Sequence, residues 1–197
     1  MNKNHLLVSL KSNSFSEKIV RAFEKVPREK FISNIYKSLA YEDIALPLEK
    51  RATISQPYTI AFMLNLLELK PKQKILEIGS GSGYVPALME EISPKNEIHG
   101  IEIIKSLAAK SRGYLKGYPN IKVISKNGFN GIPNQAPFDR ILISASTDKL
   151  PEHLYNQLSS KGILVAPVNN SIFQVKKQNN KLKVKEFSGF VFVPLKH

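Results

Sequence analysis

From Lys74 onward, short apolar runs alternate with segments in which apolar residues recur three or four positions apart. The runs have the length of strands, and the intervening segments have the period of helices. We predict strands near residues 74–78, 97–103, 121–125 and 139–144, and helices near residues 84–93, 104–116 and 151–158. A repeated strand–helix order predicts a parallel sheet that is covered on both faces.

The last third of the chain has a different pattern. After Gly162, apolar and polar residues favour strands at 163–168, 171–177 and 182–193, with Asn179-Asn180 between the last two. Such closely spaced strands are typically joined by hairpins. We therefore expect an antiparallel edge at the end of the mostly parallel sheet.

The first 56 residues favour helices followed by an irregular segment. Residues 13–38 favour two helices: the first has an apolar stripe after a capping box of Ser14 and Glu17 and ends at Pro27, and a second, short one follows. Residues 40–56 lack a steady period, so an ordered loop is expected there. The next helix starts at Pro57, since proline suits the first turn of a helix.

Length and composition indicate one globular domain. The 197 residues, 42% of them hydrophobic, can bury a full core, so we expect one domain over 1–197, with helices and a loop over 1–56 and an α/β core over 57–197. The apolar patch at residues 6–10 is too short for a secretory signal, and no run approaches the roughly 20 apolar residues that cross a bilayer. Because there is no cysteine, disulfides, thiolate metal sites and a cysteine nucleophile are excluded. We expect a cytoplasmic protein without a membrane partner.

The net charge of +13 raises the question of nucleic acid binding. The excess is spread evenly, and the only dense stretch, Lys176 to Lys185, is expected to be an exposed hairpin. Lysine far outnumbers arginine, whereas phosphate recognition favours the arginine fork. A solvated surface explains the charge better than a nucleic acid partner does.

The segment Ile-Leu-Glu-Ile-Gly-Ser-Gly-Ser-Gly at residues 75–83 is the most informative part of the chain. Its apolar half suits a buried strand, and its glycines allow a sharp turn and close approach of a ligand. Helical spacing resumes at Tyr84. This strand–loop–helix order is typical of a nucleotide-binding crossover. The alternative interpretation is that the glycines form a tight turn without a ligand.

Two acidic residues and one tyrosine narrow the choice of nucleotide. Tyr84 stands where a dinucleotide fingerprint would have its third glycine. Glu77, near the loop, would repel a pyrophosphate but favour a cation such as the sulfonium of S-adenosylmethionine. Glu102 ends the next strand, about 20 residues on, where a carboxylate can bind ribose hydroxyls. These features favour S-adenosylmethionine over a dinucleotide.

Short motifs occur along nearly the whole chain, from about residue 20 to residue 195. They are Ala40-Tyr41-Glu42-Asp43, Leu46-Pro47-Leu48, Thr53-Ile54-Ser55-Gln56-Pro57-Tyr58, Leu76 to Tyr84, Ala136-Pro137-Phe138-Asp139, Pro151 with Leu154 to Leu158, and Phe192-Val193-Pro194-Leu195. In these motifs and their order, the chain resembles the protein-L-isoaspartate (D-aspartate) O-methyltransferase family. Thr53 to Pro57 and the final motif are the most diagnostic, because many methyltransferases share the glycine loop.

The resemblance implies a Rossmann-like class I methyltransferase that moves a methyl group from S-adenosylmethionine to the free carboxylate of L-isoaspartyl residues in damaged proteins and peptides. The ester then closes to a succinimide, whose hydrolysis restores some normal aspartate. S-adenosylhomocysteine is the implied second product, and no metal is implied. The four histidines are scattered and are interpreted as surface or packing residues.

The resemblance also assigns site residues. Ser55 is the candidate catalytic residue, which helps to hold the substrate carboxylate; capping of the following helix is an alternative role. The implied cofactor residues are Glu77, Gly79, Ser80, Gly81, Ser82 and Gly83 for the methionine part, Glu102 for the ribose, and Asn127 and Gly128 for the adenine. The implied substrate residues are Thr53, Ile54, Ser144, Ala145 and Gln174.

Two departures from the family pattern affect these assignments. Lys126-Asn127-Gly128 replaces Gly-Asp-Gly, so a neutral acceptor faces the adenine amino group and cofactor binding is expected to weaken by up to roughly tenfold. Asn169-Asn170 replaces glycines beside the substrate. Two other functions stay open: an RNA methyltransferase of the same fold, and a non-catalytic relative that binds cofactor or peptide. We expect a monomer.

Overall fold

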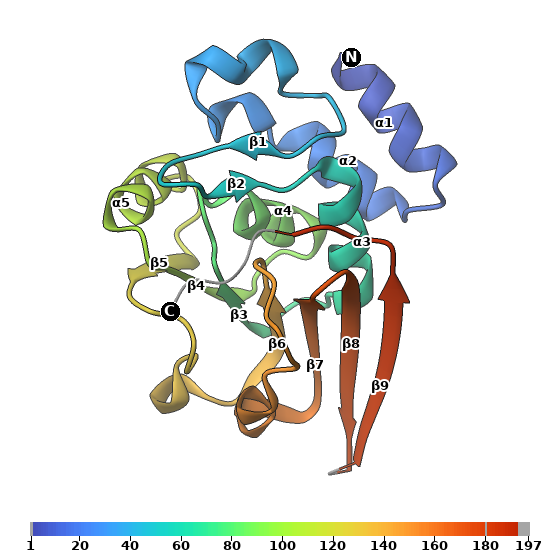
Figure 1. Cartoon of the computed structure of the whole chain (residues 1–197), viewed down its shortest axis with the longest axis vertical. Helices are drawn as coiled ribbons and strands as arrows, with labels where there is room; N and C mark the ends of the chain where they lie inside the picture. Colours follow the sequence, from blue (N-terminus) through green and yellow to red (C-terminus); the bar gives the residue numbers. More distant parts are fainter. Residues whose placement is uncertain (1, 180, 193–197) are drawn as a thin grey trace.

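The computed structural model describes residues 2–179 and 181–192. Its main sheet has seven strands in the order β5-β4-β3-β6-β7-β8-β9, of which β3 to β7 pair in parallel and β8 and β9 are antiparallel. The strands are β3 (Lys74–Ile78), β4 (Glu97–Glu102), β5 (Ile121–Ser125), β6 (Phe138–Ile143), β7 (Leu158–Val168), β8 (Ser171–Gln178) and β9 (Lys181–Ser188). The predicted parallel sheet with an antiparallel edge is confirmed (Figure 1).

The two faces of the sheet are covered differently. One face packs against the α-helices α3 (Pro57–Leu67), α4 (Tyr84–Ile92) and α5 (Lys105–Tyr114). The other face packs against the short 3₁₀-helix η4 (Glu152–Gln157) and the loop before β6, which holds the 3₁₀-turn η3 (Pro133–Gln135). The predicted α-helix near 151–158 is therefore wrong in type, because its chain makes the tighter 3₁₀ turn before β7 begins.

The chain start differs most from the expectation. An α-helix that the sequence analysis did not predict, α1 (Lys3–Ser12), buries Leu6 and Leu10. The capping box is wrong: Ser14 has a left-handed φ of 61°, and helix α2 (Glu17–Lys25) begins after Ser16. The chain continues through two 3₁₀-helices, η1 (Arg28–Lys30) and η2 (Asn34–Leu39).

Residues 40–56 contain a short ladder within the segment predicted as an ordered loop. They contain a two-stranded antiparallel ladder, β1 (Leu46–Pro47) with β2 (Thr53–Ile54), closed by a turn in which the Leu48 N–H donates to the Ala52 carbonyl at 2.8 Å. We call residues 46–54 the hairpin. Figure 1 shows it above the end of the sheet, between α5 and the N-terminal helices.

The chain leaves β9 at Ser188, earlier than the predicted end at 193. Residues 189–192 turn back across α3, where the ring of Phe190 lies 5.0 Å from the ring of Phe62 (Figure 1). Of the motif Phe192-Val193-Pro194-Leu195, only Phe192 lies within the described residues. Among the described helices, none is both long and apolar enough to cross a bilayer.

Candidate functional site

The glycine loop connects β3 to α4, as the sequence predicts. Gly79, Gly81 and Gly83 have φ values of 83°, 55° and 87°, a left-handed backbone that side chains disfavour. The N–H groups of Gly79 and Ser80 both donate to the Ile101 carbonyl, at 2.8 and 2.9 Å. These bonds fold the loop onto the end of β4.

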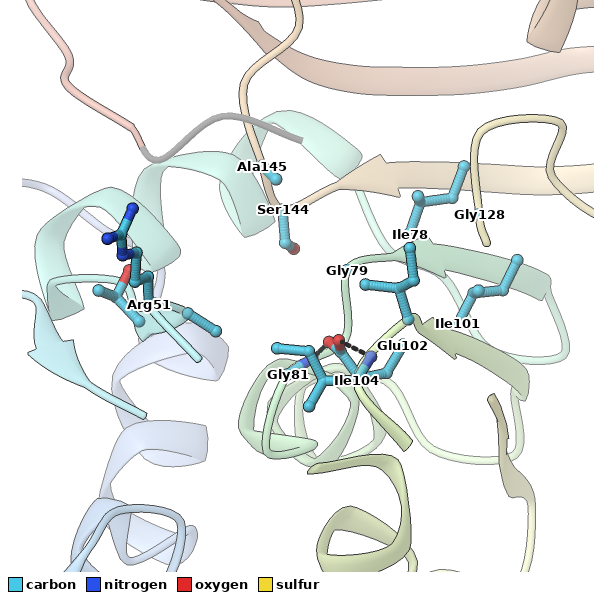
Figure 2. Close-up of a pocket in the computed structure, with 13 residues that line it drawn as sticks. Arg51, Ile78, Gly79, Gly81, Ile101, Glu102, Ile104, Gly128, Ser144 and Ala145 are labelled. Atoms are coloured by element: carbon cyan, nitrogen blue, oxygen red, sulfur yellow. Dashed lines mark hydrogen bonds between the residues drawn. The ribbon is translucent and has the colours of Figure 1, made fainter. Parts of the chain in front are cut away.

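A cavity of about 410 Å³ opens at the carboxyl ends of β3, β4 and β6. This is the point where the strand order reverses, the usual ligand position in such sheets. Figure 2 shows Arg51 of the hairpin on one side of the cavity, opposite Ile78, Gly79 and Glu102. The cavity is lined by Arg51, Ala52, Thr53, Ile78, Gly79, Gly81, Ile101, Glu102, Ile103, Ile104, Gly128, Ser144 and Ala145.

Glu102 fixes the shape of this cavity. Its Oε2 accepts from the Gly81 N–H at 2.8 Å, and its Oε1 accepts from the Ile104 N–H at 2.9 Å (Figure 2). A carboxylate has about four lone-pair sites, so acceptor capacity is left for a ligand hydroxyl. Glu102 therefore combines a structural contact with a position in the cavity wall.

A second cavity, of about 30 Å³, adjoins the first and shares Thr53, Gly79, Gly81 and Ser144 with it. It is more polar. Beyond the shared residues, its lining comprises Leu48, Ile54, Ser55, Met63, Glu77, Ser80, Ser82, Tyr84 and Val85. The two cavities together form one composite site.

Glu77 is the most perturbed acid of this site. It is 1% exposed, and the Ser144 hydroxyl donates to its Oε1 at 2.6 Å. Burial is the main cause that raises the pKa of Glu77 to about 8; the Ser144 hydrogen bond acts against it, and the nearby Glu102 adds a smaller increase. Within the described part of the chain, Glu77 Oε2 and Ser80 Oγ are buried without a hydrogen-bond partner. Two orphaned polar atoms beside one small cavity indicate a place for a polar ligand group.

Ser55 contributes to the small cavity from the segment between β2 and α3. It is not the N-cap of α3. The N-cap residue is Gln56, and its side chain makes no capping hydrogen bond. Instead, Asp43 Oδ1 accepts from the Tyr58 N–H at 2.7 Å. The hydroxyl of Ser55 is thus not used for helix capping.

Twelve of the residues assigned from the sequence line one or both cavities, and three do not. Gly83 is the N-cap of α4, where a Cβ would lie 2.7 Å from both Leu115 and Ser111 atoms. Asn127 is exposed beside the site, and its Oδ1 accepts from the Phe129 N–H at 2.8 Å. Gln174 is buried in β8, where its Nε2 donates to the Leu66 carbonyl at the end of α3.

Several lining residues were not foreseen. Arg51, Ile103 and Ile104 line the large cavity, and Tyr84 lines the small one. Ile103 ends the strand predicted at 97–103 and Ile104 follows it, so a place at the carboxyl end of a strand was the available signal for both. The local sequence around Arg51 does not predict its place in the cavity, because only the tertiary position of the hairpin brings this residue over the sheet. Among the described residues, no group of three or more histidines and acids has the arrangement of a metal site.

The residues present fit S-adenosylmethionine. Apolar walls of Ile78, Ile101 and Ile104 suit a flat adenosine, and Glu102 is in place for its ribose. A Cβ at Gly128 would lie 2.6 Å from Ile78 Cγ2, so glycine keeps this wall open. A cationic ligand group beside the orphaned oxygen of Glu77 would favour the ionised carboxylate and so offset the burial that raises its pKa.

Comparison with known proteins gives a consistent result. The family model described as "Protein-L-isoaspartate(D-aspartate) O-methyltransferase (PCMT)" matches residues 1–197. Protein-L-isoaspartate O-methyltransferase of Methanothrix thermoacetophila is 38% identical over 200 residues, covering 99% of this chain and 95% of the relative. That of Dictyoglomus turgidum is 40% identical over 187 residues, covering 92% and 84%.

A solved structure from Plasmodium falciparum, described as a protein-L-isoaspartate O-methyltransferase in complex with S-adenosyl-L-homocysteine, superposes with a TM-score of 0.85 at 26% identity. The match covers 100% of this chain and 99% of that one. On the whole-chain family match and the identity to its members, this chain belongs to the protein-L-isoaspartate (D-aspartate) O-methyltransferase family.

Proposed function

We propose that this protein transfers a methyl group from S-adenosylmethionine to the free carboxylate of L-isoaspartyl residues in damaged proteins and peptides. The observation that carries the proposal is the meeting of the Thr53–Ser55 segment with the glycine loop around one composite site. The family membership supports the same activity.

The cofactor supplies an electrophilic methyl group with its own leaving group, a sulfonium that becomes a neutral thioether. In the proposal, Glu102 binds the ribose hydroxyls, and Glu77 and Ser80 receive the polar end of the methionine part. Their buried, unpartnered atoms support this assignment. The large cavity holds the adenosine, with Gly128 keeping space beside Ile78.

The substrate needs no base. A carboxyl group with a pKa of about 3.9 is already ionised at neutral pH, so its oxygen can attack directly. The protein must align the reactants and exclude water, and orientation alone can contribute about 7–11 kcal/mol. We assign the hydroxyl of Ser55 to hold the substrate carboxylate, with Thr53, Ile54, Ser144 and Ala145 forming the surrounding wall. The burial and hydrogen bond of Gln174 favour an indirect role for it, through α3.

One incubation tests the proposal. The protein and methyl-labelled S-adenosylmethionine are incubated in three separate reactions. The first contains an isoaspartyl peptide, the second the corresponding aspartyl peptide, and the third bulk RNA. We expect label on the isoaspartyl peptide alone, as a base-labile ester. Label on RNA alone would establish the RNA methyltransferase, and label on no substrate, with retained cofactor binding, would establish a non-catalytic relative.

The proposal includes three further points: the protein is a monomer, it works in the cytoplasm, and its reaction needs no metal. Size-exclusion chromatography with light scattering tests the first, and fractionation of cells tests the second. Turnover that is unchanged by a chelator would support the third.

A further inference from the structure

Arg28 is a buried cation beside the candidate site. It opens η1, and its side chain is among the least exposed of the described residues, at 0%. Its Nη1 donates to the carbonyls of Ala40 at 2.8 Å and Glu42 at 3.4 Å. Its Nη2 donates to the carbonyls of Ile44 and Ser55, both at 3.0 Å. All four of these hydrogen bonds go to main-chain carbonyls of residues 40–55.

These four carbonyls lie at the base of the hairpin. The last residue pair of the β1–β2 ladder is Leu46 with Ile54, and Ile44 and Ser55 lie just outside it. A single nitrogen of Arg28 bridges these two positions. The guanidinium therefore continues the ladder where main-chain pairing stops.

The hairpin needs such support. Its ladder has only two residue pairs, and an isolated two-stranded hairpin is at best marginally stable in water. Yet it supplies Arg51, Ala52 and Thr53 to the large cavity, and the adjoining Ser55 to the small one. The planar, multidentate guanidinium can hold several carbonyls in fixed geometry, which a single ammonium cannot.

We infer that Arg28 is a positioning residue for methyl transfer: it fixes the base of the hairpin and, through the Ser55 carbonyl, the hydroxyl that faces the substrate. The inference rests on the proposed function for its catalytic part. Its structural part, the clamp on the hairpin, can be measured without any substrate.

Arg140 offers a matched control. It is also buried, at 5% exposure, and its guanidinium donates to three main-chain carbonyls, those of Leu67, Glu68 and Asp139. It lies near the amino end of β6, whereas the site lies at the carboxyl ends of the strands. Arg140→Lys therefore makes the same chemical change at a distance from the hairpin.

The experiment compares wild type, Arg28→Lys and Arg140→Lys, with Arg28→Gln as a second variant should the first not accumulate as folded protein. Hydrogen exchange is measured at the amides of Leu48 and Ala52, whose hydrogen bonds form the turn that closes the hairpin. Turnover of the isoaspartyl peptide is measured per folded molecule, and affinity for S-adenosylhomocysteine by calorimetry.

We expect faster exchange of the hairpin in the Arg28 variant alone. The kcat of the Arg28 variant should fall on the order of 10²-fold, because a small displacement of the Ser55 hydroxyl misaligns the reactants. The affinity for S-adenosylhomocysteine should fall much less. Equal exchange and equal turnover in Arg28→Lys and Arg140→Lys would overturn the inference. Lost turnover with unchanged hairpin exchange would overturn it too, since Arg28 would then act by another route. If wild type does not methylate the peptide, the proposed function fails, and the exchange data alone decide whether Arg28 clamps the hairpin.

Discussion

The hydroxyl of Ser144 donates a 2.6 Å hydrogen bond to Glu77 Oε1, which joins the carboxyl ends of β6 and β3 inside the site. The bond partly offsets the burial that raises the pKa of Glu77. A buried carboxyl with one hydroxyl partner and one orphaned oxygen makes both the stability of the protein and its ligand affinity sensitive to pH.

The first prediction concerns stability and Glu77. Its pKa is raised in the folded state, from 4.5 to about 8, so the folded protein keeps a proton that the unfolded chain loses between these values. The contribution is fully present below pH 4.5 and is lost as the pH rises through 8, by on the order of a few kcal/mol. Urea unfolding at pH 5, 7 and 9 should show Glu77→Gln gaining stability relative to wild type as the pH rises. Parallel stability curves for the two proteins would contradict this.

The second prediction concerns the open wall at Gly128. In Gly128→Ala the new Cβ would meet Ile78 Cγ2 at 2.6 Å, so we expect the affinity for S-adenosylhomocysteine to fall by tenfold or more, about 1.4 kcal/mol. The control is Gly113→Ala in α5, where the new Cβ would meet no atom within 4 Å apart from its chain neighbours and the backbone of its own helix. It should leave affinity unchanged and stabilise the helix by up to about 1 kcal/mol. Calorimetry decides, and equal affinities in the two variants would refute the assignment.

The third prediction concerns the tip of the hairpin. Glu49 accepts from the Ser106 hydroxyl at 2.5 Å and pairs with Lys110, so α5 holds the tip through groups that are partly exposed. Lys110 and then Ser106 lower the pKa of Glu49. We expect Glu49→Gln to speed the release of S-adenosylhomocysteine with little change in stability, since exposed pairs contribute little.

Stopped-flow release measures this effect at several salt concentrations. Glu17→Gln, which breaks the exposed pair with Arg21 on α2, serves as the control. Identical release rates in the two variants would show that the tip is not held by Glu49.

The fourth prediction concerns Arg51, which has a left-handed φ of 67° and lines the large cavity from the hairpin side (Figure 2). A cation there attracts an anionic peptide, so Arg51→Gln should raise KM for the isoaspartyl peptide. The increase should be up to about fivefold, which corresponds to the free energy that an exposed ion pair contributes. The effect should shrink with added salt. Lys161→Gln, outside the cavity lining, should leave KM unchanged; a salt-independent effect at Arg51 would point to packing instead.

The fifth prediction concerns Asn127, which replaces the usual aspartate. Its Oδ1 already accepts from the Phe129 N–H, so Asn127→Asp keeps this bond and adds a charged oxygen. We expect cofactor affinity to rise by up to roughly tenfold, as charged acceptors bind more strongly. Calorimetry with Asn130→Asp as the neighbouring control tests this, and no selective gain at 127 would remove Asn127 from the adenine site.

Much of the sheet follows from local sequence. The predicted strand at 74–78 and helix at 84–93 correspond to β3 (Lys74–Ile78) and α4 (Tyr84–Ile92). Apolar period, turn glycines and strand length are encoded within a few residues, so these elements and the site loop between them could be predicted. The chain start could not, because α1 is weakly amphipathic and packs mainly against α2.

The sequence alone determined the glycine loop, the mostly parallel character of the sheet and the motifs that identify the family. The tertiary structure decided which of these residues meet. Glu77 and Ser144 are 67 positions apart, and Arg28 and Ser55 are 27 apart. The same packing set Gln174 against the end of α3 and the hairpin over the cavity. Such contacts depend on how elements that are far apart in the sequence pack together. A local pattern of hydrophobic and polar residues does not encode that packing.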